Sequence, residues 1–181
     1  MNSNVRPLIP PRRQTIASFS VQGPFVVSTT KLPVGRQISS ANAKAFWALH
    51  TGIASEVGCY VFAFKAAKGY KPIYAGKATK SFKQEVFTPH KLNHFNTGLG
   101  HQRKGTPVLF FVCLNKTAGA VSKSAINEAE SYLIQAGLAA NSALLNDKKT
   151  KVATWSINGI VRSQAGKPSA AANEFRKCIK V

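Results

Sequence analysis

Acidic residues are scarce in this sequence. Only six of the 181 residues are Asp or Glu, whereas 25 are Lys or Arg, and the formal net charge is +19. Such an excess of positive charge favours polyanionic partners, and nucleic acid is the first of these to consider. The scarcity disfavours a multi-carboxylate, two-metal centre. Any cation site must draw on Glu56, Glu85, Glu128, Glu130, Asp147 or Glu174.

Paired cysteines and long apolar runs are also missing. Cys59, Cys113 and Cys178 are far apart and form no CxxC pair, so no structural zinc site is predicted. No stretch approaches the roughly 20 apolar residues of a membrane-spanning helix. We therefore expect a cytoplasmic protein with no membrane partner. Its expected partner is DNA, with RNA as the open alternative.

Proline and charge divide the chain into three regions. Residues 1–38 contain no acid and include Pro7, Pro10 and Pro11, which predicts a loose, basic N-terminal extension. Residues 39–147 are predicted to form the core, because apolar residues make up 44% of the chain and Phe occurs 11 times. Residues 148–181 form a basic C-terminal extension that we expect to pack on the core and contact phosphates. A solvated charged surface is the alternative for this region.

The hydrophobic pattern of the core predicts an α/β (α+β) fold. We expect a small three-stranded, mainly antiparallel sheet flanked by helices. The strands are predicted at 57–65, 73–76 and 106–115. Helices are predicted to begin after the serine caps at 39–40 and 122–124, with short helical pieces around 82–87 and 90–95 and a closing helix after Pro168.

Two of these strands each carry a tyrosine. They lie in the segment "GCYVFAFKAAKGYKPIYAGKA" at residues 58–78, which contains Tyr60 and Tyr74. Pairing of the two strands would bring both phenols to one face of the sheet. A functional pair and ordinary hairpin core packing with exposed hydroxyls are both open.

Glu130 occupies an unusual position on the helix predicted at 122–137. Ile126, Ala129, Leu133 and Ala136 form an apolar stripe, and Glu130 borders it. A carboxylate that faces a core needs a partner, because burial of an unpaired charge is unfavourable. A divalent cation and a Lys or Arg side chain are the two candidates.

These pieces occur in the order found in a known nuclease family. "GCY" at 58–60, "YAG" at 74–76, "ExxLI" at 130–134 and "LLN" at 144–146 together resemble the GIY-YIG endonuclease superfamily over about residues 57–147. The lysine in "IYAGKA" makes the chain more similar to the restriction-endonuclease branch than to the homing enzymes.

The resemblance implies a divalent-metal-dependent DNA endonuclease that hydrolyses phosphodiester bonds with Mg²⁺ or Mn²⁺. It implies that Tyr60 helps to activate the attacking water and that Tyr74 lines the scissile phosphate. Gly76 would let the backbone approach the phosphate, Glu130 would be the single metal ligand, and Asn146 would be the asparagine near the end of the core.

One family residue has no direct counterpart. No arginine occurs between Arg36 and Arg103, where the family places one on a helix. His90 and Lys91 are the candidates to replace it as catalytic residues. A catalytically impaired GIY-YIG-like nucleic-acid-binding protein is therefore the alternative function. The residues expected to contact DNA are Gly76, Lys77, Lys83, His94, Arg103, Lys104 and Asn146.

A base role for Tyr60 would require help from its surroundings. A free tyrosine has a pKa of about 10, so nearby cations are needed to lower it. Lys65, Lys77, Lys83 and Lys91 are the lysines expected close to this phenol.

Overall fold

The computed structural model describes residues 17–67, 69–101, 104–115, 121–151 and 167–179. They belong to two compact units, Met1–Lys148 and Lys149–Val181. The second unit contains the predicted closing helix, α6 (Ala170–Ile179). All other helices and strands named below lie in the first unit.

A four-stranded antiparallel sheet forms the centre of the first unit, in the order β1-β6-β4-β5. Its strands are β1 (Phe19–Val26), β4 (Gly58–Ala66), β5 (Gly69–Ala78) and β6 (Thr106–Leu114). The prediction of three strands was therefore wrong. The additional strand, β1, comes from the segment that we assigned to a loose extension.

The sequence pattern hides β1 for a physical reason. The strand is an edge strand, and most of its residues are exposed, so no clear alternation of apolar and polar residues marks it. It also contains Pro24, which is tolerated because the register of the β1–β6 pairing shifts between Gln22 and Phe25.

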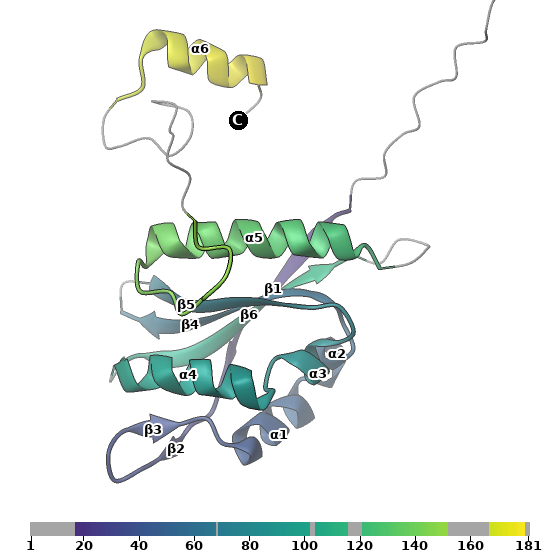
Figure 1. Cartoon of the computed structure of the whole chain (residues 1–181), viewed down its shortest axis with the longest axis vertical. Helices are drawn as coiled ribbons and strands as arrows, with labels where there is room; N and C mark the ends of the chain where they lie inside the picture. Colours follow the sequence, from purple (N-terminus) through teal and green to yellow (C-terminus); the bar gives the residue numbers. More distant parts are fainter. Residues whose placement is uncertain (1–16, 68, 102–103, 116–120, 152–166, 180–181) are drawn as a thin grey trace, which may run out of the picture. The chain divides into compact units, whose positions relative to one another are not determined.

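Helices cover both faces of the sheet (Figure 1). One face carries α1 (Ser40–Leu49), α2 (Thr51–Ala54), α3 (Phe82–Glu85) and α4 (Pro89–His101), and the opposite face carries α5 (Lys123–Ala140). A small hairpin of β2 (Thr30–Lys31) and β3 (Arg36–Gln37) precedes α1. The serine caps were predicted correctly, since the hydroxyls of Ser39 and Ser122 accept hydrogen bonds from the first turns of α1 and α5.

Side-chain alternation along β4 separates the two layers. Tyr60, Phe62 and Phe64 belong to the aromatic core beneath α1–α4, where the rings of Phe62 and Phe95 stack 4.3 Å apart. Cys59 and Val61 instead pack against residues of α5. The two sides of the sheet therefore have separate cores.

The outer edge of β5 is covered by the segment that follows α5. The backbone N–H of Leu145 donates to the carbonyl of Ile73, and the side chain of Asn141 donates to the carbonyl of Pro72. The side-chain amide of Asn146 makes two hydrogen bonds to the backbone of Ala75. Its carbonyl oxygen accepts from the Ala75 N–H, and its NH₂ group donates to the Ala75 carbonyl. These bonds satisfy the backbone groups that an edge strand would otherwise expose.

Among the helices that the structure describes, none is long and apolar enough to cross a membrane.

Candidate active site

Tyr60 and Tyr74 lie on the same face of the sheet, as predicted. Tyr60 on β4 pairs with Gly76 on β5, and Phe62 pairs with Tyr74, so the two tyrosines occupy positions of the same parity. Their ring centroids are 6.3 Å apart. Both face the layer that contains α3 and α4.

The hydroxyl of Tyr60 is buried and has no hydrogen-bond partner among the described residues. It lies directly over Gly76, where a Cβ atom would come within 2.5 Å of the hydroxyl oxygen. Only glycine leaves room for the phenol at this point of the strand. A buried hydroxyl without a partner is rare in folded proteins, and each such case needs a specific explanation.

Burial raises the pKa of Tyr60 well above its ordinary value, and the nearby Tyr74, Glu85 and Glu130 raise it further. The shift is opposite to the lowering of the pKa that a base role for Tyr60 would require. The phenol therefore stays protonated at neutral pH and can donate a hydrogen bond.

The hydroxyl of Tyr74, by contrast, is held by α4. It accepts a short hydrogen bond from the ammonium of Lys91, whose nitrogen also lies 4.8 Å from the centroid of the Tyr74 ring. His94 stacks on the same ring at a centroid distance of 4.9 Å. Helix α4 thus brings a cation and an imidazole to one phenol.

His90 and His94 are one helical turn apart, and their Nε2 atoms are separated by 3.1 Å. One of these nitrogens must accept the hydrogen bond, so at least one ring is neutral. Burial and the neighbouring His90 lower the pKa of His94, and Lys91 adds to this effect, whereas Asp147 opposes it. The lowered pKa keeps the His94 ring neutral at neutral pH, so one of its ring nitrogens is available as a hydrogen-bond acceptor.

Glu130 faces β5 from the other layer. Its carboxylate accepts a hydrogen bond of 3.1 Å from the ammonium of Lys77, and the side chain is 14% exposed. Lys77 follows Gly76, so it points to the α5 face of the strand while Tyr60 lies on the opposite face. A lysine is thus one partner of Glu130, as the sequence left open. Ala136, which we placed on the buried stripe, is exposed; Ile134 and Gly137 are buried in its stead.

Glu85 is a residue that the sequence analysis did not single out. It ends α3, whose Phe82 packs in the same core as both phenols. The Glu85 carboxylate contributes more than Glu130 to the raised pKa of Tyr60. Two signals in the sequence could have identified it: it lies shortly after the strand that carries Tyr74, and it is one of only six acidic residues.

The remaining predicted residues are distributed around the molecule. Asn146 lies beside β5 and is engaged with the backbone of Ala75. Lys83 is exposed on α3. Lys104 is exposed just before β6, at the end of the sheet remote from Tyr60. Arg103 lies outside the described residues.

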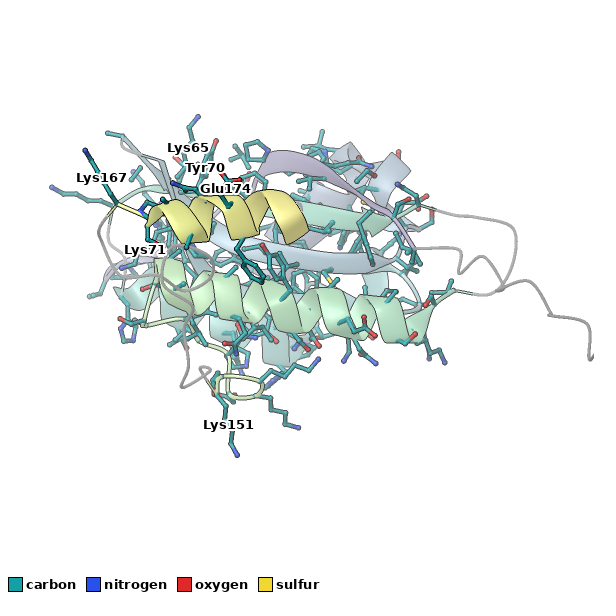
Figure 2. The ribbon with its side chains drawn as sticks, turned by 90° about the horizontal axis from the view of Figure 1, so that it is seen from above. Lys65, Tyr70, Lys71, Lys151, Lys167 and Glu174 are labelled. Carbon is teal, nitrogen blue, oxygen red and sulfur yellow. The ribbon has the colours of Figure 1, made fainter. Side chains whose placement is uncertain are left out.

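Lys65 is not a neighbour of Tyr60, contrary to our expectation. It lies with Tyr70 and Lys71 near the turn of the β4–β5 hairpin, and Lys65 and Tyr70 are cross-strand partners (Figure 2). Lys65 lies five positions along the strand from Tyr60, a distance of about 17 Å at ~3.3 Å per residue.

The arrangement offers few ligands for a metal ion. Within the described part of the chain, no three His, Cys, Asp or Glu side chains come close enough together to hold one. A carboxylate such as Glu130 still suits Mg²⁺, which often binds proteins through one or two carboxylates, with water and phosphate oxygens as its other ligands.

Comparisons of the chain with protein-family models, curated proteins and solved structures found no match. Function is therefore inferred from the geometry above.

Proposed function

We propose that this protein is a divalent-metal-dependent DNA endonuclease of the GIY-YIG type. The observation that supports this most strongly is the buried hydroxyl of Tyr60, which has no hydrogen-bond partner among the described residues and lies beside the Tyr74–Lys91–His94 cluster. A net charge of +19 supplies the attraction for a nucleic-acid backbone.

Tyr60 acts as a hydrogen-bond donor in this proposal. Its raised pKa keeps the proton on the phenol. Since the hydroxyl has no described partner, its hydrogen bond is available for a phosphoryl oxygen or for the attacking water. A donor aimed at developing negative charge accelerates such reactions by about 10²–10³-fold. Because Tyr60 is fully buried, the substrate must open a path to it.

The His90–His94 pair acts as the general base. At least one ring is neutral and accepts a hydrogen bond from the other, so the pair can take a proton from water and share it. Lys91 holds Tyr74 and places positive charge beside it, which is the task that the family's arginine would otherwise perform.

Glu130 holds the metal ion in this proposal. Mg²⁺ or Mn²⁺ bound there would supply positive charge to the phosphoryl oxygens. Glu130 and the phenols lie on opposite faces of β5, yet the charge of Glu130 reaches Tyr60 and raises its pKa. In this proposal, the substrate phosphate binds at the part of β5 around Gly76 and Lys77, beyond the segment that Asn146 covers.

A nucleic-acid-binding protein without nuclease activity is the second candidate. The specific observation in its favour is the Lys77–Glu130 ion pair, which places an ammonium 3.1 Å from an oxygen of the proposed metal ligand. In this candidate, DNA binding remains and depends steeply on salt, because phosphate contacts release counterions.

The test is nicking of supercoiled plasmid with Mg²⁺ or Mn²⁺ by the wild type and by Glu130→Gln. Glu128→Gln is the matched control, since Glu128 is exposed on the same helix and the charge change is the same. We expect the wild type and the control to nick equally and Glu130→Gln to lose about 10²-fold or more. Equal nicking by all three proteins, or by none of them with either metal, contradicts the proposal.

A further inference from the structure

A cavity lies on the α1–α4 side of the sheet, and we refer to it as the α1–α4 cavity. Its volume is about 570 Å³, and its lining includes Lys44, Trp47, Thr51, Lys83, Phe87 and Leu92. Neither phenol of the candidate active site lines it. Its residues come from α1, α2, α3, the connection after α3, and the first turns of α4.

The floor of the α1–α4 cavity is aromatic. Trp47 and Phe87 contact each other edge to face, with ring centroids 5.7 Å apart. Leu92 completes the apolar surface. Although Trp47 is mostly buried and packs on the core, it is among the residues that line the cavity.

The rim of the cavity is basic. Lys44 on α1 and Lys83 on α3 are both exposed and stand on different helices around the aromatic floor. None of the described lining residues is acidic. An aromatic floor beneath two ammonium groups suits a flat ring that carries negative charge on both sides.

We propose that the α1–α4 cavity binds an unstacked base of single-stranded nucleic acid. The base packs against Phe87 and Trp47, and the flanking phosphates contact Lys44 and Lys83. Sequence-tolerant binding of single strands commonly combines aromatic side chains with a basic groove in this way. A base inside a duplex is covered by its neighbours and cannot enter, so this site selects unpaired nucleotides.

The cavity adjoins the candidate active site across the first turn of α4. Leu92 lines the cavity, whereas Lys91, its neighbour in the chain, donates to Tyr74. A strand that crosses this turn can therefore reach both places. The inference rests on the nucleic-acid binding that the proposed function requires, but it does not require cleavage.

Tryptophan fluorescence tests the inference directly. The chain has two tryptophans, Trp47 and Trp155, so Trp155→Phe leaves Trp47 as the sole tryptophan reporter. Trp155 lies outside the described residues. This protein is titrated in EDTA with a short oligothymidylate and with an abasic strand of equal length and charge. We expect saturable quenching by the oligothymidylate, and binding of the abasic strand without quenching.

Substitutions at the rim and floor separate the two kinds of contact. The double variant Lys44→Gln, Lys83→Gln should bind both the oligothymidylate and the abasic strand with about 10-fold or more lower affinity, because phosphate contacts are lost. Lys31→Gln with Lys123→Gln, exposed lysines on β2 and α5, should change neither affinity appreciably. Phe87→Leu should lower the affinity for the oligothymidylate by about 5-fold or more, since stacking on this ring is lost, and should lower the affinity for the abasic strand much less.

Equal quenching by the two strands, or equal effects of the rim and control pairs, overturns the inference. Plasmid nicking by the same preparations reports on the endonuclease separately. Plasmid nicking without quenching refutes only the proposed binding of a base in the α1–α4 cavity. Quenching by the oligothymidylate but not by the abasic strand supports that binding even where nicking is absent.

Discussion

Replacement of Tyr60 by phenylalanine is expected to stabilise the protein. The substitution removes a hydroxyl that is fully buried and makes no hydrogen bond to the described residues, while the ring remains in place over Gly76. An unsatisfied buried polar group carries a desolvation penalty of about 1–3 kcal/mol. Relief of this penalty should raise the melting temperature by about 2–4 °C for each kcal/mol in a chain of this size.

Thermal and chemical denaturation of three variants measure this effect. Tyr74→Phe is the contrasting variant, because its hydroxyl accepts from Lys91, and it should lose stability. Tyr132→Phe is the matched control, since this tyrosine is 72% exposed and should change stability little. A Tyr60→Phe protein that is less stable than the wild type would show that the hydroxyl has a partner, and the reasoning about Tyr60 would be refuted.

Three further predictions follow from the same geometry. Gly76→Ala should destabilise the protein by about 1–3 kcal/mol in chemical denaturation, because the added Cβ would lie 2.5 Å from the Tyr60 ring; a much smaller loss contradicts the packing. Asn146→Ala should lower the free energy of unfolding by about 1–3 kcal/mol, because two hydrogen bonds to the backbone of Ala75 are lost. Hydrogen exchange at the Ala75 amide should also become faster, and an unchanged exchange rate would contradict the role of Asn146 at this edge of the sheet. The lowered pKa of His94 means that its contribution to stability is full above the unfolded-state value of about 6.5 and is lost as pH falls toward the folded-state value. His94→Gln should therefore reduce the loss of melting temperature over this acid range, and an identical pH dependence in both proteins would contradict the shift.

The strands of the sheet centre were predictable because burial leaves a clear signature. β4 and β6 are apolar over most of their length, and the serine caps marked where α1 and α5 begin. β1 was missed because an exposed edge strand has little apolar pattern. The single helix α4 was read as short pieces, since its glycines argue against a helix. Gly98 is required there because a Cβ would collide with Ile73 on β5.

The candidate site was predictable to the extent that local periodicity determines it. Alternation along two paired strands was enough to place Tyr60 and Tyr74 on one face. The partner of Glu130 was not predictable, because it depends on which strand residue faces α5 after folding. The absence of a described hydrogen-bond partner for the Tyr60 hydroxyl was also not predictable from the sequence, since it depends on how the whole core packs around the phenol.

The cleavage rate of Tyr60→Phe under single-turnover conditions tests the central claim most directly. A labelled duplex is cleaved with Mg²⁺ by the wild type, by Tyr60→Phe and by Tyr132→Phe, and duplex affinity is measured for each protein in EDTA. We predict equal affinities, an unchanged rate for Tyr132→Phe, and a rate about 10²-fold lower for Tyr60→Phe. Cleavage by Tyr60→Phe at the rate of the wild type would contradict the claim that this buried phenol takes part in phosphodiester hydrolysis.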